Sequence, residues 1–318
     1  MGFLVTNTLL LGPIALGIVG YGKIARDQHL PAIDALGHFA PAAVADPHAS
    51  HPDLPGHADI DALLAAHPEV TAVSLCQPPR FRLEAARAAL RAGRHVMLEK
   101  PPALTMEDLA ELVALAREKG VTLYTAWHSR EAAAVDAALE WLGRTTIRAV
   151  SIIWKEDVRR WHPGQTWIWQ KGGFGVFDPA INALSILTHI VPGPISVEKA
   201  RLEVPANCQT PIAGQVAMLS ADGAPIAMEL DFLQTGPQSW DIVVEADAGT
   251  LTLGHGGNSL TIDGVEQAVG PEREYQRLYA RFAALIAAGE SEVDGEPLRL
   301  ALNAIDGGEV VAVAEFHE

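Results

Sequence analysis

Pro13-Ile14-Ala15-Leu16-Gly17-Ile18-Val19-Gly20-Tyr21-Gly22-Lys23-Ile24-Ala25 is the stretch that decides the fold. Its first seven residues form a short apolar run, typical of a buried strand. The pattern G-x-G-x-x-A follows, and a helix-like segment then runs to Leu36. Small residues here let the backbone turn tightly and approach a pyrophosphate at the helix N-terminus. We therefore predict a dinucleotide-binding turn, with cofactor contacts from Gly20, Gly22, Lys23 and Ile24.

A second predicted strand, residues 42–45, ends at Asp46, which lies 24 positions after Gly22. A carboxylate near this spacing binds the adenosine ribose in dinucleotide-binding folds, although Asp46 could also be an ordinary turn residue before Pro47. It would accept hydrogen bonds from the 2′-hydroxyl of NAD and repel the 2′-phosphate of NADP. No arginine follows in residues 47–51, so NAD is the preferred cofactor, while two histidines and a serine there leave NADP open.

Strand and helix patterns continue to alternate up to residue 126. Strands are predicted at residues 71–76, 95–97 and 121–126, with helices at 61–66, 81–92 and 105–119. This alternation predicts an α/β domain with a doubly wound parallel sheet, a Rossmann domain, over residues 1–127. The carboxyl ends of parallel strands meet at one edge of the sheet. That edge would add cofactor contacts from Cys76, Gln77, Pro78, Glu99 and Lys100, and would also hold Trp127-His128.

Lys100 is the residue of greatest chemical interest in this half. It follows a buried strand, and Pro101 and Pro102 stop that strand and fix the backbone just past the amine. Ligands of open α/β sheets bind at such strand ends. We expect Lys100 to point into a cleft between a nicotinamide and a substrate hydroxyl. The alternative is an exposed lysine that ends a strand.

Residues 128–318 have a different pattern and predict an α+β domain with an open, mostly antiparallel sheet. The turn dipeptides Asp222-Gly223 and Asp263-Gly264 separate pairs of strand-like segments, which indicates hairpins. Helices are expected at residues 175–190, 272–288 and 298–316, covering one face of the sheet. The C-terminal helix could instead pack back on the first domain.

Two stretches of this second domain carry candidate binding residues. Four of the seven tryptophans lie in residues 154–169, interleaved with charged and amide side chains, and this mixture suits a sugar or an ordinary packed loop. A glycine-rich stretch, residues 171–176, then leads to Asp178 and Asn182. Residues four apart project from one face of a helix. Asp178, just before Pro179, could instead be a simple N-cap.

Composition narrows the function classes. The chain has 318 residues, 49% of them hydrophobic, and a formal charge of -16, so we expect neither a nucleic-acid nor an anionic-membrane partner. Cys76 and Cys208 are the only cysteines and lie far apart, which favours a reducing, cytoplasmic compartment and no metal site. Residues 1–12 are predicted to be an N-terminal extension, with a signal peptide over the apolar segment that starts at Phe3 as the alternative.

The motifs together resemble the glucose–fructose oxidoreductase/inositol dehydrogenase (Gfo/Idh/MocA) family. The resemblance rests on the glycine turn, on Glu99-Lys100-Pro101, and on the glycine-rich turn leading to Asp178 and, four residues later, Asn182. Many members carry His at the position of Asn182. Residues 126–130 and 161–169 look closer to the aldose 1-dehydrogenases that act on D-galactose and L-arabinose.

The resemblance implies a function for this chain. It would be an NAD(P)-dependent oxidoreductase that converts D-galactose, and also D-fucose and L-arabinose, to the aldonolactone. Lys100 and Asp178 would be the catalytic pair, with the assignment of the proton acceptor left open between them. The implied substrate-binding residues are Lys100, His128, Glu156, Trp161, His162, Asp178, Asn182 and Trp240. The alternatives are a dehydrogenase of another sugar or of an inositol, an NAD-assisted lyase or isomerase, and a non-catalytic dinucleotide-binding sensor. The exposed face of the second sheet leaves a homodimer open.

Overall fold

The computed structural model describes residues 12–318, which form two compact units. The first unit comprises residues 12–103, 107–126 and 275–293. The second comprises residues 104–106, 127–274 and 294–318. The extension predicted at residues 1–12 lies outside the described residues apart from Gly12, and so does the start of the alternative signal segment.

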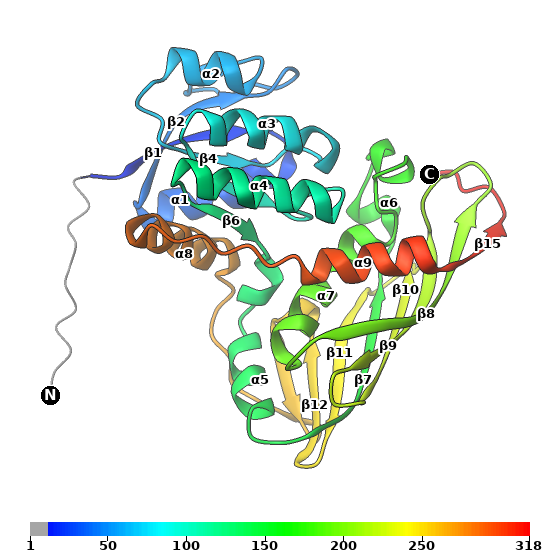
Figure 1. Ribbon diagram of the computed structural model, residues 1–318. Helices are drawn as coiled ribbons and strands as arrows, with labels where there is room; N and C mark the ends of the chain where they lie inside the picture. Colours follow the sequence, from blue (N-terminus) through cyan, green and yellow to red (C-terminus); the bar gives the residue numbers. More distant parts are fainter. Residues whose placement is uncertain (1–11) are drawn as a thin grey trace, which may run out of the picture. The chain divides into compact units, whose positions relative to one another are not determined.

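A parallel sheet forms the centre of the first unit, with the strand order β3-β2-β1-β4-β5-β6 (Figure 1). Its strands are β1 (Ile14–Val19), β2 (Phe39–Ala45), β3 (Gly56–His57), β4 (Ala72–Leu75), β5 (His95–Glu99) and β6 (Leu123–Ala126). All neighbouring strands pair in parallel, so their carboxyl ends share one edge. Strands that follow β1 in the sequence are added first on one side of it and then, from β4 on, on the other side. Open α/β sheets bind their ligands at such a switch point. The predicted doubly wound sheet is confirmed.

Helices cover both faces of this sheet. They are the π-helical turn η1 (Ala25–His29), α1 (Leu30–Leu36), α2 (Ile60–Ala66), α3 (Pro79–Arg91), α4 (Met106–Lys119) and α8 (Glu274–Ala288). Leu16 and Ile18 of β1 share a buried cluster with residues of α1 and α8. Gly17, between them, faces the opposite side, where a Cβ would lie 3.1 Å from Leu63 of α2. This alternation follows from the period of two in a strand.

The second unit is built on a nine-stranded sheet with the order β14-β13-β12-β11-β7-β10-β9-β8-β15. Its strands are β7 (Ile147–Lys155), β8 (Ile195–Pro205), β9 (Ala213–Ser220), β10 (Pro225–Asp231), β11 (Ser239–Ala246), β12 (Gly249–Gly254), β13 (Ser259–Ile262), β14 (Val265–Glu266) and β15 (Glu309–Val313). The pairs β7–β10 and β8–β15 are parallel, and the others are antiparallel. Both Asp-Gly dipeptides connect antiparallel neighbours, as predicted.

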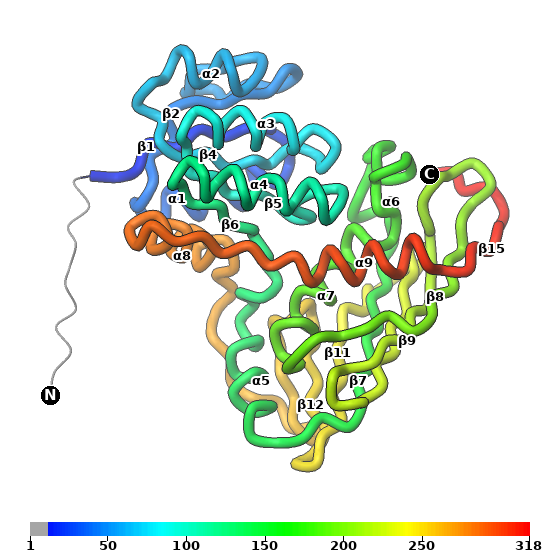
Figure 2. Tube along the Cα trace, viewed as in Figure 1, coloured from blue at the N-terminus to red at the C-terminus, as the bar shows by residue number. Residues whose placement is uncertain are grey.

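The second unit contains the helices α5 (Val135–Leu142), α6 (Val158–Trp161), α7 (Phe177–Ile190) and α9 (Glu296–Gly307), with the 3₁₀ turns η2 (His128–Glu131), η3 (Thr166–Trp169) and η4 (His255–Gly257). Of these, α5, α7 and α9 cover one face of its sheet (Figure 2). Helix α7 contacts β7, and α9 contacts both α7 and β8. Along β9 and β10, buried residues alternate with exposed ones, so the other face of the sheet is open within this unit.

Two sequence-based expectations about helix boundaries are wrong. The helix expected at residues 298–316 ends at Gly307, and residues 309–313 form β15 beside β8. A Cβ at Gly308 would lie 2.6 Å from the carbonyl oxygen of Ala304, and the β-branched residues after it favour a strand. Asp178 is not an N-cap either, because α7 begins at Phe177 with Val176 as its cap.

Helix α8 is joined to the sheet of the first unit by aromatic packing, whereas the last helix, α9, belongs to the second unit. The fully buried Phe282 of α8 stacks on Phe39 with ring centroids 5.4 Å apart, and on Tyr124 at 6.0 Å.

Among the described residues, every helix is too short or too polar to traverse a lipid bilayer.

The Phe282→Ala variant should lower the free energy of unfolding by about 3–5 kcal/mol, because it removes a large buried ring and leaves a cavity. The matched variant Phe81→Ala removes the same atoms from a side chain that is 53% exposed, and should change stability by roughly 0.5 kcal/mol or less. Urea denaturation of both variants measures the difference. Equal losses would show that α8 does not stabilise the first unit.

Candidate functional site

The glycine turn after β1 is shaped by a close approach between two strand ends. Gly20 has φ +90°, and a Cβ there would lie 2.5 Å from the backbone nitrogen of Gln77, just past β4. Its own N–H donates to the carbonyl oxygen of Ala45 at 2.8 Å. A Cβ at Gly22 would meet nothing within 4 Å. Gly20 is therefore required by the protein itself, whereas Gly22 leaves room for a ligand beside the turn.

The other predicted residues of this turn divide between surface and core. The exposed ammonium of Lys23 pairs with the carboxylate of Asp27, one turn along η1. The side chain of Ile24 packs against the buried cluster of the first unit. A cofactor contact by Ile24 would therefore be made by its backbone.

Asp46 ties the end of β2 to the glycine turn. Its Oδ2 accepts the backbone N–H of Tyr21 at 2.8 Å, and its Oδ1 accepts those of His48 and Ala49 at 2.8 and 3.0 Å. A carboxylate oxygen has two acceptor positions, so Oδ2 retains one for a ribose hydroxyl. Asp46 thus has the turn role that the sequence left as the alternative, and its Oδ2 also links β2 to the glycine turn.

The chain after β4 forms a second wall of the same edge. Cys76 is buried, and its thiol donates to the carbonyl oxygen of Ser74 at 3.8 Å. Pro78 caps α3, and the side-chain amide of Gln77 donates to the carbonyl oxygen of Phe81 at 3.1 Å. All three predicted residues therefore follow the strand next to β1, at the switch point of the sheet.

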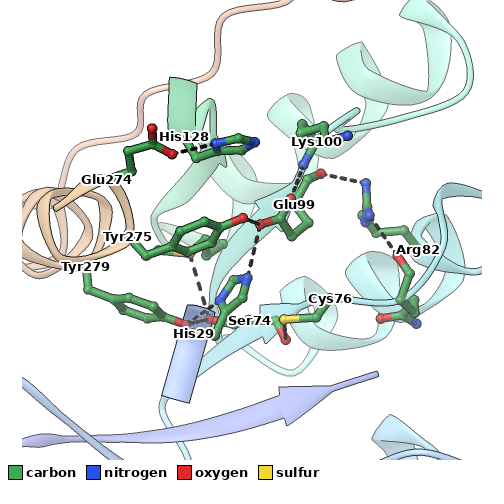
Figure 3. A network of polar contacts seen from close by, with 12 residues as sticks. His29, Ser74, Cys76, Arg82, Glu99, Lys100, His128, Glu274, Tyr275 and Tyr279 are labelled. Carbon is green, nitrogen blue, oxygen red and sulfur yellow. Dashed lines mark hydrogen bonds and ion pairs between the residues drawn. The ribbon is translucent and has the colours of Figure 1, made fainter. Parts of the chain in front are cut away.

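The Glu99-Lys100 pair ends β5 at this edge (Figure 3). The buried carboxylate of Glu99 accepts the backbone N–H of Lys100 through Oε2 at 2.9 Å. Its Oε1 lies 3.0 Å from Nε2 of His29 and accepts the hydroxyl of Tyr275 at 2.7 Å. The Lys100–Pro101 peptide is cis.

The imidazole of His29 is buried behind Glu99. Burial by itself would lower the pKa of the His29 imidazole, but the acidic groups around it, Cys76, Tyr279 and Glu99, outweigh burial and raise its pKa well above the ordinary value. One ring nitrogen of His29 faces Glu99, and the other lies 2.7 Å from the hydroxyl of Tyr279. That hydroxyl lies 2.9 Å from Oγ of Ser74.

In the second unit, two of the predicted sugar-binding residues, His162 and Trp240, contact the buried carboxylate of Glu156. This carboxylate follows β7 and is buried. Its Oε1 lies 2.9 Å from Nε2 of His162, and its Oε2 accepts the indole N–H of Trp240 at 2.8 Å. The side chains come from the β7–α6 connection, the end of α6 and the start of β11, so the topology of the sheet brings together residues far apart in the sequence.

Aromatic rings form a wall next to Glu156. The rings of Trp161 and Trp240 meet edge to face with centroids 4.9 Å apart, and Trp154 stacks on Trp240 at 6.3 Å. The ring of His162 lies 5.5 Å from that of Phe232. Apolar ring faces beside a charged hydrogen-bonding group suit a pyranose, because a pyranose has C–H faces and a rim of hydroxyls. Trp154 belongs to the tryptophan-rich stretch singled out in the sequence, whereas Phe232 is a member of this wall that the sequence did not indicate.

Asp178 joins this cluster from the first turn of α7. Its buried Oδ2 lies 3.9 Å from Nδ1 of His162, and Asn182 follows one turn later on the same helix. The glycine-rich approach is needed for packing, because a Cβ at Gly173 would lie 2.2 Å from the carbonyl oxygen of Trp167 and one at Gly175 would lie 2.3 Å from that of Pro211.

His128 has a partner that the sequence did not indicate. Its Nδ1 lies 2.9 Å from Oε2 of Glu274, whose Oε1 accepts a hydrogen bond from Asn258 at 3.2 Å. The short helix η2 that carries His128 is attached to α7, because Arg130 donates to the carbonyl oxygen of Ser185 at 2.8 Å. The ring of His128 is thus held by Glu274 in the second unit.

The buried residues behind Lys100 were not predicted from the sequence. His29 and Arg82 lie on helices where the amphipathic pattern gives no sign of a site, and Tyr275 and Tyr279 lie on α8, far along the chain. Lys100 belongs to the first unit and Asp178 to the second. Among the described residues, no group of His, Cys, Asp and Glu side chains has the arrangement of a metal site.

Comparison with known proteins assigns the chain to a family of oxidoreductases. Residues 14–127 match the model of the oxidoreductase family with an NAD-binding Rossmann fold, Gfo/Idh/MocA. Galactose 1-dehydrogenase of Pseudomonas fluorescens is 44% identical over 306 residues, which are 96% of this chain and 99% of that protein. The chain therefore belongs to the Gfo/Idh/MocA family, and it is an NAD(P)-dependent oxidoreductase.

Solved structures agree with this assignment. The crystal structure of D-galactose-1-dehydrogenase from Rhizobium etli has a TM-score of 0.93 and 51% identity, covering 97% of this chain and 99% of that one. KijD10, a 3-ketoreductase from Actinomadura kijaniata solved with NADP and TDP-benzene, has a TM-score of 0.82 at 19% identity, covering 95% and 99%. The second likeness shows the fold alone.

Alanine substitutions at the two turn glycines should have opposite effects. Gly20→Ala should lower the melting temperature, because the new Cβ meets the backbone of Gln77 and φ is positive. Gly22→Ala should leave the melting temperature nearly unchanged and weaken dinucleotide binding, since it fills the space beside the turn. Thermal unfolding and NADH fluorescence titration separate the two. Loss of stability in Gly22→Ala with unchanged binding would contradict this interpretation of the turn.

Proposed function

We propose that this protein is an aldose 1-dehydrogenase that oxidises C1 of D-galactose to the aldonolactone. The observation that carries the proposal is the cluster of Glu156, His162, Asp178 and Trp240 in the second unit. It combines buried hydrogen-bonding groups with aromatic faces. The two relatives named galactose dehydrogenase match nearly the whole chain, including this unit.

The proposed oxidation removes a proton and a hydride from the sugar. A cyclic aldose is a hemiacetal, and its oxidation removes the hydrogen on C1 as hydride and the hydrogen of the anomeric hydroxyl as a proton. The carbon–oxygen bond then becomes the carbonyl of a lactone. Bound NAD supplies the hydride acceptor. The protein must supply a proton acceptor and a group that stabilises the oxygen as it loses its proton.

Lys100 and Asp178 are the residues to which we assign these two roles. Asp178 is a buried carboxylate beside His162, and we assign it the proton acceptor. Lys100, at the end of β5, would donate a hydrogen bond to the developing oxyanion. The two groups would titrate as a pair. The reverse assignment, with Lys100 as the proton acceptor, would therefore give a similar pH profile of activity.

The other predicted residues would hold the sugar. Glu156 already accepts hydrogen bonds from two side chains, so its spare acceptor positions would face a sugar hydroxyl while Trp161 and Trp240 pack against the ring. Asn182 and His128, both linked to α7, would bind the remaining hydroxyls. D-Galactose, D-fucose and L-arabinose share their configuration at C2 to C4, so one set of hydrogen bonds would hold all three.

NAD is the cofactor that we propose as preferred, with NADP accepted more weakly. Oδ2 of Asp46 keeps one acceptor position for a ribose 2′-hydroxyl, and the carboxylate would repel a 2′-phosphate. The glycine turn and the chain from Cys76 to Pro78 would bind the rest of the dinucleotide.

We also propose a homodimer formed through the open face of the second sheet. Large apolar side chains on that face, Ile153 and Leu219, are 39% and 37% exposed.

Both cysteines are free, which supports the expected cytoplasmic location.

Lys100→Met should lower kcat by about 10²–10⁴-fold while the dissociation constant for NAD changes little, because the change removes a charge used in the transition state. Asp178→Asn should have a similar effect. Lys119→Met is the matched control, since Lys119 is a lysine of the same unit at the surface end of α4. Stopped-flow NADH absorbance and NAD titration give both constants. Retained turnover in Lys100→Met would remove the lysine from the mechanism.

A panel of aldoses with NAD and NADP should show the highest kcat/KM for D-galactose with NAD. D-Fucose and L-arabinose should follow, because a methylene-sized difference near C5 changes binding by only roughly 1–3 kcal/mol. D-Glucose should be poorer, since its inverted C4 hydroxyl leaves a buried protein group unpaired. If glucose gave the highest kcat/KM, or if no aldose reduced NAD, the proposed function would be wrong.

A further inference from the structure

Three backbone groups next to the Lys100 side chain are each held by a buried side chain (Figure 3). The N–H of Lys100 donates to the carboxylate of Glu99 at 2.9 Å. The carbonyl oxygen of Glu99 accepts from Nη1 of Arg82 at 2.5 Å, and the same nitrogen also donates to the carbonyl oxygen of Pro101. The backbone is therefore fixed on both sides of the amine-bearing residue.

Arg82 anchors this segment to a neighbouring strand end. Its guanidinium is almost completely buried on α3, and Nη2 donates to the carbonyl oxygen of Gln77 at 2.7 Å. One side chain thus joins the chain after β4 to the chain after β5. A guanidinium suits this task because its donors lie in a rigid plane and can reach several acceptors at once.

Glu99 is anchored from the opposite side by η1 and α8. Its Oε1 contacts both His29 and the hydroxyl of Tyr275, which is 176 residues further along the chain. His29 is in turn held by Tyr279, which reaches Ser74 on β4. All of these side chains are buried. The carboxylate cannot turn away from the Lys100 N–H without losing two strong partners in a poorly solvated environment.

Such a network is costly for a protein core. Buried charges lose hydration, and apolar residues of similar volume often give equal or greater stability. A network of this kind is more readily explained if it holds a particular geometry. Here its contacts converge on the backbone around one residue, and that residue is Lys100.

We propose that Tyr275, His29 and Arg82 are positioning residues for Lys100, acting through Glu99 and the backbone carbonyls on either side of the lysine. The catalytic half of this inference rests on the proposed function, in which Lys100 stabilises the developing oxyanion. The network fixes the backbone from which the Lys100 side chain projects, and so limits the positions that the amine can reach. A displacement of about 1 Å at a reacting group can lower the rate by roughly 100-fold.

The test compares Tyr275→Phe with Tyr124→Phe. The first variant removes one hydroxyl donor from Glu99 and keeps the ring. The second makes the same chemical change in a buried tyrosine of the same core, on β6. Neither change creates a large cavity, so both proteins should fold.

The first measurement needs no substrate. The chain contains six lysines, so ¹⁵N-lysine labelling gives six backbone amide signals, and the Lys100→Met variant identifies the one from Lys100. Hydrogen exchange of the Lys100 amide should be at least 10-fold faster in Tyr275→Phe than in the wild type, and within twofold in Tyr124→Phe. The other five lysines report any general loss of stability. Unchanged exchange at Lys100 would overturn the proposal.

The second measurement is steady-state kinetics with D-galactose and NAD. Tyr275→Phe should lower kcat by about 10–100-fold with the dissociation constant for NAD within twofold, and Tyr124→Phe should leave kcat within twofold. Faster exchange without a fall in kcat would reject the positioning role. A wild-type protein that oxidised no aldose would reject the proposed function, and the exchange result would still decide whether the network holds Lys100.

Discussion

The burial of the Glu99 carboxylate is the constraint on which the functional edge of the first unit depends. A carboxylate that is removed from water needs hydrogen-bond donors on both oxygens. Without them the group would be protonated, or its burial would destabilise the surrounding structure. Here the donors come from the next residue, from His29 on η1 and from Tyr275 on α8. Each hydrogen bond therefore fixes the place of one element. The strand end, the π-helical turn and the distant helix are held together around a single charge.

The second unit follows the same principle with a different result. Glu156 directly follows β7, and its two oxygens are occupied by His162 and Trp240. Its donors are rings, so the carboxylate lies within an aromatic wall instead of within a helix–sheet core. The hydrogen bond to Glu156 also orients His162, whose other nitrogen faces Asp178. A buried acid thus arranges the groups that are available to bind a polar ligand.

Both networks explain why local sequence rules fail where they do. A histidine and an arginine at buried positions on helices, where apolar residues would pack, are exceptions to the usual pattern. His29 and Arg82 are such exceptions. Both ring nitrogens of His29 and both terminal nitrogens of Arg82 have partners among hydroxyls, a carboxylate and backbone carbonyls, so the cost of burial is reduced but not removed. Protein cores retain such residues where geometry matters more than stability.

The sequence by itself determined the alternation of strands and helices, the glycine turn, the two Asp-Gly hairpins and the position of Lys100 at a strand end. These features are local, because backbone sterics and the burial period of one element specify them. The sequence did not determine that the last predicted helix stops at Gly307 and continues as an edge strand, since β15 forms only when β8 is beside it. Nor did it determine that Tyr275 contacts Glu99 or that Trp240 contacts Glu156. Those pairs depend on strand order and on the return of α8 to the first sheet, and no local period records which distant residues will meet.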